Sequence, residues 1–270
     1  MNTSDKIERL VAHLGTFPKM TIAVSGGIDS MVLSFIAHLY YPKSTTACHA
    51  HSPAVPQQAM KRIFDYTGRY EWNLKLVDAG EFADNNYLKN PINRCYYCKS
   101  NLYKRLSVAN SGVVMSGTNT DDLSDFRPGL QAAEQQKVVH PYVDVGISKQ
   151  DIYAIAKHLG LFDLQTLPSQ PCLASRVETG IGILPADLKF IDKVESAVNA
   201  ILESRHDVRC RMTYQGVILE MAPLPEGAIM ADIQAVTKAL CQRSGNLFSG
   251  IRLYQRGSAF VGKEAYREAV

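Results

Sequence analysis

The chain has 270 residues, of which 46% are hydrophobic and 20% charged, so it is long enough to bury a sizeable core and form two compact units. Its 29 basic and 26 acidic residues leave a net charge of +3, which gives no support to a large RNA as substrate. No apolar run approaches a membrane span and the first residues lack a signal-peptide pattern, so we expect a cytoplasmic protein without a membrane partner.

Helices and strands are expected to alternate over the first 160 residues. Apolar positions at helical spacing predict a first helix over residues 3 to 15. The following pattern predicts strands at 20–24, 45–50, 73–78 and 112–116, and helices at 29–40, 57–69, 96–110 and 148–158. This alternation predicts an α/β fold with a doubly wound parallel sheet. Ligands of such sheets bind at the carboxyl ends of the strands.

The second part of the chain has a different pattern. Residues 163 to 184 contain several prolines and glycines without sustained periodicity, which predicts a boundary or an active-site loop. Beyond it we expect a helix at 186–204, strands at 208–213 and 216–221, a helix at 228–242 and a strand at 249–254. The predicted domains are therefore residues 1–165 and a smaller α+β domain at 166–270.

A glycine-rich segment directly follows the first predicted strand. Its sequence is Ser-Gly-Gly-Ile-Asp-Ser at residues 25 to 30, and neither G-x-x-x-x-G-K-[ST] nor G-x-G-x-x-G occurs in the chain. Bare backbone, hydroxyl groups and the N–H groups of the next helix can together hold phosphate oxygens. The segment resembles the PP-loop of the ATP pyrophosphatases, which implies ATP as cosubstrate; an ordinary turn is the alternative. The predicted ATP-binding residues here are Ser25, Gly26, Gly27, Asp29 and Ser30.

A second polar loop follows the strand at 112–116 and should emerge at the same edge of the sheet. We expect Gly117 and Thr118 to lie beside the nucleotide, and the carboxylates of Asp29 and Asp121 to hold the Mg²⁺ that ATP brings. A plain Asx turn is the alternative for this loop. Two further cations are expected to offset the charge of the pyrophosphate: Lys99 and Arg127.

Three of the six cysteines form a pattern with chemical meaning. Cys95 and Cys98 open a predicted helix and lie on one face, and Cys172 lies in the irregular loop. Three thiolates from two segments suit a 4Fe-4S cluster with one open iron. A zinc site, a redox pair and inert thiols are the alternatives. Structural disulfides are not expected in a cytosolic chain of this size.

The second domain carries a candidate phosphate clamp. Arg209 and Arg211 alternate along a predicted strand and so point to one face, and Arg176 lies in the preceding loop beside Ser175. Guanidinium groups bind phosphate through paired hydrogen bonds, so these residues are expected to hold a phosphorylated substrate. A polar, solvent-facing side of the strand is the alternative.

The motifs together resemble the LarE family, the ATP-dependent sulfur transferases of nickel-pincer nucleotide biosynthesis. The likeness rests on the PP-loop, Cys95-Tyr-Tyr-Cys98-Lys99, Asp125-Phe-Arg-Pro-Gly129, Cys172-Leu-Ala-Ser-Arg176 and Val208-Arg-Cys-Arg211, and it extends through Glu220. It implies that a carboxylate of a pyridinium dicarboxylate mononucleotide is adenylated and that sulfur then replaces AMP. It also implies a 4Fe-4S cluster on Cys95, Cys98 and Cys172, catalytic roles for Asp29 and Lys99, and a homo-oligomer.

Two segments depart from the family pattern. His51-Ser-Pro-Ala-Val-Pro-Gln-Gln58 lacks the acidic residues expected there, and Arg252-Leu-Tyr-Gln-Arg-Gly-Ser-Ala259 lacks the usual Gly-aromatic-Arg-x-Gly-Ser-Met-Asn ending. These differences do not affect the residues expected to act on ATP. They leave the identity of the sulfur acceptor undetermined by the sequence. The alternatives are a tRNA thiolation enzyme of the PP-loop superfamily, an amide-forming ligase, and a nucleotide-binding sensor without turnover.

Overall fold

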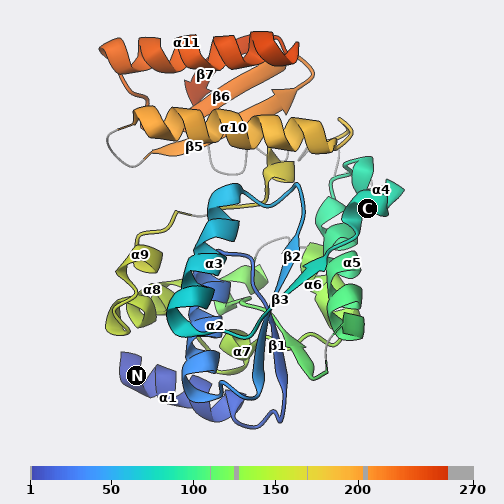
Figure 1. Ribbon diagram of the computed structural model, residues 1–270, viewed down its shortest axis with the longest axis vertical. Helices are drawn as coiled ribbons and strands as arrows, with labels where there is room; N and C mark the ends of the chain where they lie inside the picture. The colour runs from blue at the N-terminus through green and yellow to red at the C-terminus, as the bar shows by residue number, and fades with distance from the viewer. Residues whose placement is uncertain (1, 110, 125–127, 169, 203–205, 255–270) are drawn as a thin grey trace. The chain divides into compact units, whose positions relative to one another are not determined.

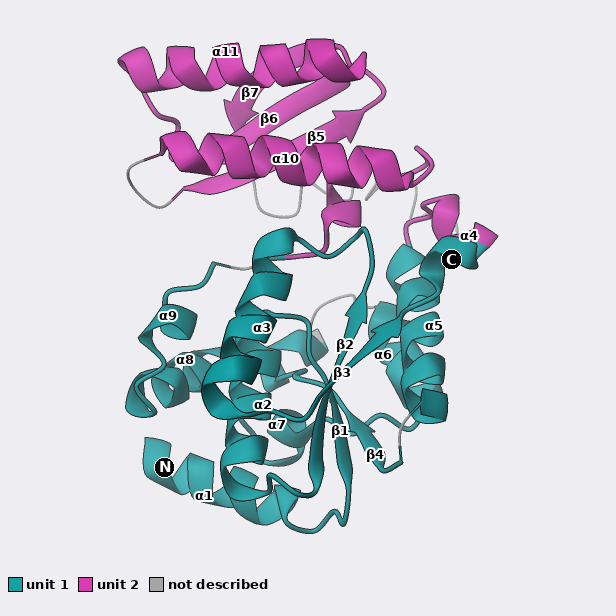
Figure 2. Ribbon diagram, in the orientation of Figure 1, with its two compact units in different colours: residues 1–84, 93–170 teal, residues 85–92, 171–270 magenta. Residues whose placement is uncertain are grey.

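The computed structural model describes residues 2–109, 111–124, 128–168, 170–202 and 206–254. The chain divides into two compact units, drawn in different colours in Figure 2: residues 1–84 with 93–170, and residues 85–92 with 171–270. Arg127, one of the predicted ATP-site cations, lies outside the described residues. Among the helices of the described ranges, none combines the length and the apolar character needed to cross a membrane.

A four-stranded, all-parallel sheet lies at the centre of the first unit. Its strands are ordered β3-β2-β1-β4, and their bounds are β1 Met20–Ala23, β2 Thr45–His51, β3 Leu74–Asp78 and β4 Val113–Met115. Strand β1 therefore lies between the second and fourth strands of the chain, and the chain order reverses beside it (Figure 1). Ligands of open α/β sheets bind at such a reversal.

Helices cover both faces of this sheet, as the alternating pattern predicts. They are α1 Thr3–Leu14, α2 Ile28–Tyr40, α3 Gln57–Tyr70, α5 Arg94–Ala109, α6 Pro128–Gln135, α7 Pro141–Asp144, α8 Lys149–His158 and α9 Phe162–Gln165. Neighbouring residues of β2 belong to different cores: Ala47 packs with α1, α2, α3 and α8, whereas Cys48 packs with α5 and α6. Successive side chains of a strand point to opposite faces, so the sheet is doubly wound and the predicted fold class is confirmed.

Local signals explain where the helices at the ends of this unit begin. Asn2 and Asp5 form a capping box at the start of α1, and Ser148 and Asp151 form another at the start of α8. In each box the first side chain accepts from a backbone N–H one turn later, and the second accepts from the cap itself. The second box fixes the position of Lys149, the first residue of α8.

The second unit is a small α+β structure with a three-stranded mixed sheet. Strands β5 Asp207–Thr213 and β6 Gly216–Ala222 are antiparallel, and β7 Phe248–Leu253 pairs parallel to β6. Helices α10 Pro185–Ile201 and α11 Gly227–Ser244 contact each other and pack on this sheet (Figure 1). A 3-10 turn, η3 Leu173–Arg176, precedes them and contacts both α10 and β5.

A short segment from the first half of the chain belongs to this second unit. Residues 85–92, which include α4 Asn85–Leu88, lie among residues of the later half. The side-chain amide of Asn90 donates to the carbonyl oxygens of Val177 at 3.3 Å, Glu178 at 2.9 Å and Ile181 at 3.0 Å. Since Asn90 is fully buried, these bonds fix residues 85–92 to the loop that follows η3.

Candidate functional site

The predicted phosphate loop connects β1 to α2. The hydroxyl of Ser30 accepts from the N–H of Ser25 at 3.0 Å, lies 3.1 Å from the hydroxyl of Ser25 and donates to the carbonyl of Gly27 at 3.1 Å. Gly27 is the N-cap of α2 and offers no capping side chain. The first N–H groups of α2 therefore lack a side-chain cap, as in helix ends that bind phosphate.

Two glycines are required by close packing around this loop. Gly26 has a φ of 80°, and a Cβ there would lie 2.7 Å from the carbonyl oxygen of Ala59 on α3. A Cβ at Gly117 would lie 2.8 Å from the backbone nitrogen of Ser30. The loop after β4 thus packs directly against the first turn of α2. The structure brings together the predicted residues Ser25, Gly26, Gly27, Asp29, Ser30 and Gly117 at the carboxyl edge of the sheet.

Asp29 is neutralised by a lysine that lies 120 residues later in the chain. Lys149 Nζ donates to both carboxylate oxygens of Asp29, at 2.7 Å each. Burial raises the pKa of Asp29, while the charge and hydrogen bonds of Lys149 act to lower it. The buried hydroxyl of Tyr142 donates to the Asp29 carbonyl oxygen at 3.0 Å and so fixes the first turn of α2.

The second predicted acidic group reaches the same lysine through the backbone. The carboxylate of Asp121 accepts from the N–H of Lys149 at 3.2 Å, and the N–H of Asp121 donates to the side chain of Asn119. The Asx turn that the sequence allows here is therefore formed, and it aims Asp121 toward the start of α8. Oxygen ligands of this kind suit Mg²⁺. Asp29 binds the ammonium group of Lys149, whereas Asp121 binds the backbone N–H of the same residue.

A polar network lies at the end of β4. The hydroxyl of Ser116 lies 2.8 Å from His140 Nδ1 and 2.9 Å from the hydroxyl of Thr118. Burial lowers the pKa of His140, two nearby carboxylates act to raise it, and the charge of Lys99 acts to lower it. The ammonium of Lys99 also lies 5.5 Å from the ring centre of Tyr103. Thr118 bonds to Ser116 and the charge of Lys99 acts on His140, so both predicted residues lie near the polar end of β4.

The three predicted ligand cysteines lie in both units. Cys95 and Cys98 are half-buried on the first turns of α5 in the first unit, and Cys172 is exposed at the start of η3 in the second. The other three cysteines, Cys48, Cys210 and Cys241, are buried. Over the described ranges, no group of three His, Cys, Asp or Glu side chains is gathered in a way that could hold a metal ion.

Arg176 supports the backbone that carries Cys172. Its guanidinium forms a paired bond with Glu195 of α10, at 2.8 and 3.0 Å, and donates to the carbonyl oxygens of Pro171 at 2.8 Å and Cys172 at 3.3 Å. Both partners of this ion pair are largely shielded from solvent, with side chains 3% and 12% exposed. Glu195 also accepts from the N–H of Cys210 in β5. Cys172 is thereby exposed on a firmly anchored turn.

Arg211 and Arg252 share one buried carboxylate. Glu220, 1% exposed, accepts from Arg211 Nε at 2.8 Å through one oxygen and from Arg252 Nη2 at 2.7 Å through the other. Arg211 also donates to the carbonyl of Ser175 at 2.8 Å. Arg209 is buried, and its guanidinium lies 5.3 Å from the ring centre of Tyr254. The arginines of β5 thus do not form a plain solvent-facing row.

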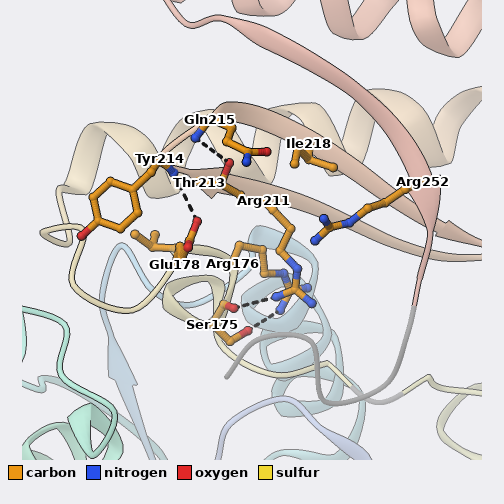
Figure 3. Close-up of a pocket in the computed structure, with 10 residues that line it drawn as sticks. Ser175, Arg176, Glu178, Arg211, Thr213, Tyr214, Gln215, Ile218 and Arg252 are labelled. Atoms are coloured by element: carbon orange, nitrogen blue, oxygen red, sulfur yellow. Dashed lines mark hydrogen bonds between the residues drawn. The ribbon is translucent and has the colours of Figure 1, made fainter. Parts of the chain in front are cut away.

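A pocket of about 220 Å³ opens beside this carboxylate (Figure 3). Its lining includes the predicted substrate-phosphate residues Ser175, Arg176 and Arg211, together with Arg252. Arg209 does not line it. The pocket lies entirely within the second unit and includes residues of η3, which begins directly after Cys172.

Sequence reasoning missed several residues of these sites, among them Lys149, Glu195, His140 and Glu220. Lys149 follows a capping serine at the start of a predicted helix, and that position is the only local signal it carries. Its partner Asp29 is 120 residues away in the chain. Glu195 lies in the middle of an amphipathic helix, where an acidic residue is ordinarily taken as part of a solvated face.

Comparison with known proteins shows which relatives this chain has. No protein-family model matches the chain. An uncharacterised protein of Synechocystis sp. is 32% identical over 225 residues, covering 81% of this chain and 82% of the relative. Pyridinium-3,5-bisthiocarboxylic acid mononucleotide synthase of Lactiplantibacillus plantarum is 29% identical over 157 residues, 56% of this chain and 57% of that protein. A probable tRNA sulfurtransferase of Methanosarcina acetivorans is 24% identical over 181 residues, 60% of this chain and 42% of that protein.

Proposed function

Because the chain belongs to the LarE-like family of PP-loop sulfurtransferases, we propose that it activates a carboxylate of a small phosphorylated acceptor with ATP and then exchanges the activating group for sulfur. In the first step a carboxylate oxygen attacks the α-phosphorus, and the bond to the β-phosphate oxygen breaks, releasing pyrophosphate. In the second step sulfur attacks the acyl carbon, the bond to the AMP oxygen breaks, and AMP leaves.

The phosphate loop and the Asp29–Lys149 pair are the observation that carries this proposal. A carboxylate is a poor acyl donor because oxide leaves badly, and attachment to AMP provides a better leaving group. Charge grows on the departing pyrophosphate, so fixed donors and cations at that point lower the barrier. The uncapped N–H groups of α2 and the ammonium of Lys149 are the donors that the first unit offers.

Asp29 and Asp121 are the residues proposed to hold Mg²⁺ with ATP. Asp29 already binds the ammonium group of Lys149, and Asp121 accepts from the backbone N–H of that residue, so both carboxylates lie at the start of α8. In the proposed complex Lys149 turns from Asp29 to a phosphate oxygen. The ion would neutralise phosphate charge when bound. Lys99 is proposed as a further cation toward the pyrophosphate.

Sulfur delivery is proposed to involve Cys95, Cys98 and Cys172. Their thiol chemistry fits the iron atoms of a 4Fe-4S cluster, which when bound would supply a transferable sulfide. Two of these thiols lie in the first unit and the third in the second, so this ligand set stays a prediction. The chain's own contribution is the anchoring of Cys172 by Arg176 and Glu195.

The acceptor is proposed to be a pyridinium carboxylate mononucleotide, the class that the name of the Lactiplantibacillus plantarum relative indicates. The second candidate is tRNA thiolation, since the Methanosarcina acetivorans relative is a probable tRNA sulfurtransferase. The small pocket beside Ser175 supports the first candidate, because an open pocket of about 220 Å³ suits a small molecule.

The test is acceptor-dependent formation of AMP and pyrophosphate by the purified, anaerobically prepared protein. Pyridinium-3,5-biscarboxylic acid mononucleotide should stimulate turnover and yield a thiocarboxylate, whereas bulk tRNA should not. Stimulation by tRNA with formation of a thiolated nucleoside would favour the second candidate. A Cys172→Ala variant should retain acceptor-dependent release of pyrophosphate and lose the thiocarboxylate product. Iron and acid-labile sulfide content of the wild type and of Cys95→Ala tests the cluster separately.

A further inference from the structure

The pocket of the second unit has two ends of opposite chemical character. Figure 3 shows Tyr214 and Glu178 on one side and Arg252 on the opposite side, with Ser175 and Arg211 between them. These residues come from the η3 loop, the β5–β6 turn and β7, which meet only in the folded unit. An anionic group therefore fits one end and a cationic group fits the other.

Arg252 is the solvent-exposed cation of the basic end. Its side chain is 52% exposed, and its Nε and Nη2 atoms both donate to the same Glu220 oxygen, at 3.0 and 2.7 Å. The hydrogen bonds found for Arg252 in the described ranges leave its Nη1 group without a protein acceptor. Glu220 is shared with Arg211, so the three side chains together keep one positive charge. This arrangement suits a phosphate monoester.

The acidic end combines a carboxylate with an exposed aromatic ring. Glu178 accepts from the backbone N–H of Tyr214 at 3.2 Å, and no salt bridge to Glu178 occurs within the described residues. Tyr214 is 71% exposed, although it lines the pocket. Its hydroxyl lies against Gly180, where an added Cβ would lie 2.8 Å from the hydroxyl oxygen. The ring can take this position because residue 180 has no side chain. A carboxylate beside an aromatic face suits a flat cation.

We infer that Arg252, Glu178 and Tyr214 determine acceptor specificity by reading the two ends of a zwitterionic mononucleotide, its phosphate at Arg252 and its cationic ring at Glu178 and Tyr214. The inference rests on the proposed function and adds to it the residues that select the acceptor. Arg252 opens the C-terminal segment that departs from the family's usual ending. The enzyme thereby selects the ring charge as well as the phosphate.

Binding of three probes to the full chain without ATP tests this inference. Nicotinamide mononucleotide carries a cationic ring and a phosphate, its reduced form carries a neutral ring and the same phosphate, and nicotinamide riboside lacks the phosphate. Calorimetry on the wild type should show affinity about tenfold higher for the oxidised than for the reduced mononucleotide, and the weakest binding for the riboside.

The variants separate the two ends. Glu178→Gln should lower affinity for the oxidised mononucleotide about tenfold and leave the reduced form within about twofold. Arg252→Ala should lower affinity for both mononucleotides about tenfold and leave the riboside unchanged. Arg243→Ala, an exposed arginine of α11, is the matched control and should change none of these affinities. Circular dichroism melting of each variant verifies that it is folded.

Two results would overturn the inference: equal effects of Glu178→Gln on the oxidised and reduced mononucleotides, or no effect of Arg252→Ala on either. Failure of the proposed function looks different, because it would abolish acceptor-dependent release of pyrophosphate while these ATP-free affinities remain. Conversely, normal adenylation of a pyridinium carboxylate mononucleotide with charge-independent binding would refute only the inference.

Discussion

Lys149 and Asp29 form a paired ion bridge at the phosphate loop, with both Asp29 oxygens 2.7 Å from the lysine nitrogen. Lys149 is the first residue of α8 and Asp29 lies in the first turn of α2, so the bridge joins two helices that begin at the same edge of the sheet. It places a cation next to the predicted ATP site in a protein whose phosphate loop itself contains no lysine.

Replacement of Lys149 by Met should shift the pH dependence of adenylation. Burial raises the pKa of Asp29 and Lys149 opposes that rise, so loss of the ammonium should raise the Asp29 pKa further. The ionised carboxylate is needed for cation binding, so the acidic limb of the pH profile should move to higher pH. Pyrophosphate exchange into ATP between pH 5 and 8 measures the shift. Lys157→Met, an exposed site on the same helix, should leave the limb in place.

Gly26→Ala should destabilise the first unit and weaken ATP binding. The added Cβ would clash with backbone at Ala59, and the residue would have to keep a positive φ. Together these effects should cost about 2–4 kcal/mol and lower the melting temperature by about 5 °C or more.

Two other glycines serve as controls for that substitution. Gly27 has a φ of −78°, and the nearest atom to an added Cβ is the Ser25 hydroxyl at 3.5 Å, so Gly27→Ala should leave the melting temperature nearly unchanged. Gly68 lies within α3 with open space around it, so Gly68→Ala should raise the free energy of unfolding by about 0.5–1 kcal/mol. Equal melting temperatures for all three variants would contradict the packing argument.

Arg176 and Glu195 should show strong energetic coupling. Glu195→Gln leaves the Arg176 guanidinium buried without its counter-charge, which should cost about 3 kcal/mol. The double variant Arg176→Met with Glu195→Gln should be more stable than Glu195→Gln alone, because no lone charge is buried. Urea unfolding of both single variants and the double variant measures the coupling.

Stability recovered in that double variant should not restore sulfur transfer. The bonds from Arg176 to the carbonyl oxygens of Pro171 and Cys172 would still be absent. We expect thiocarboxylate formation to fall at least about tenfold, since a loosened reactive group loses its orientation. Recovery of both stability and transfer would show that Arg176 matters only for folding.

Buried histidines should make the first unit less stable in acid. Burial lowers the pKa values of His38 and His49 below 6.5, so the unfolded chain takes up protons that the folded chain resists. Their contribution is complete above pH 6.5 and decreases as the pH falls below that value, by up to about 1.4 kcal/mol per pH unit for each histidine.

His49→Asn should therefore flatten the fall of the unfolding free energy between pH 6.5 and 5. Comparison of slopes with the wild type removes the contribution of every other group, including Asp29. Exposed His158 provides the control, since His158→Asn should reproduce the wild-type slope. A wild-type slope in His49→Asn would show that this histidine does not resist protonation.

The elements with strong local signals could be predicted from the sequence. The strand, loop and helix around Gly26, the helix that begins near residue 148 and the alternating strands were visible because each depends on neighbours within a few residues. The short helices α4, α6, α7 and α9 were not predicted, since four to eight residues carry too little periodicity.

The ion-pair partners of the arginines could not be predicted from the sequence, for a physical reason. Arg176 and Arg211 were recognised as cations of a candidate phosphate site, but the glutamates they contact lie on other elements and are selected only by folding. A guanidinium group that is predicted to bind substrate can instead hydrogen-bond to the backbone of a loop. Arg176 does so at the carbonyl oxygen of Cys172. Whether it also touches substrate stays a prediction.

The three bonds from Asn90 bear on how this protein can be dissected. The polypeptide passes between its units at residues 84/85, 92/93 and 170/171, so a cut after residue 170 does not separate two complete pieces. A fragment starting at Pro171 would leave the carbonyl oxygens of Val177, Glu178 and Ile181 without their amide donor. The second unit is thus built partly from residues 85–92 of the first half of the chain, so neither unit can be exchanged by a single cut.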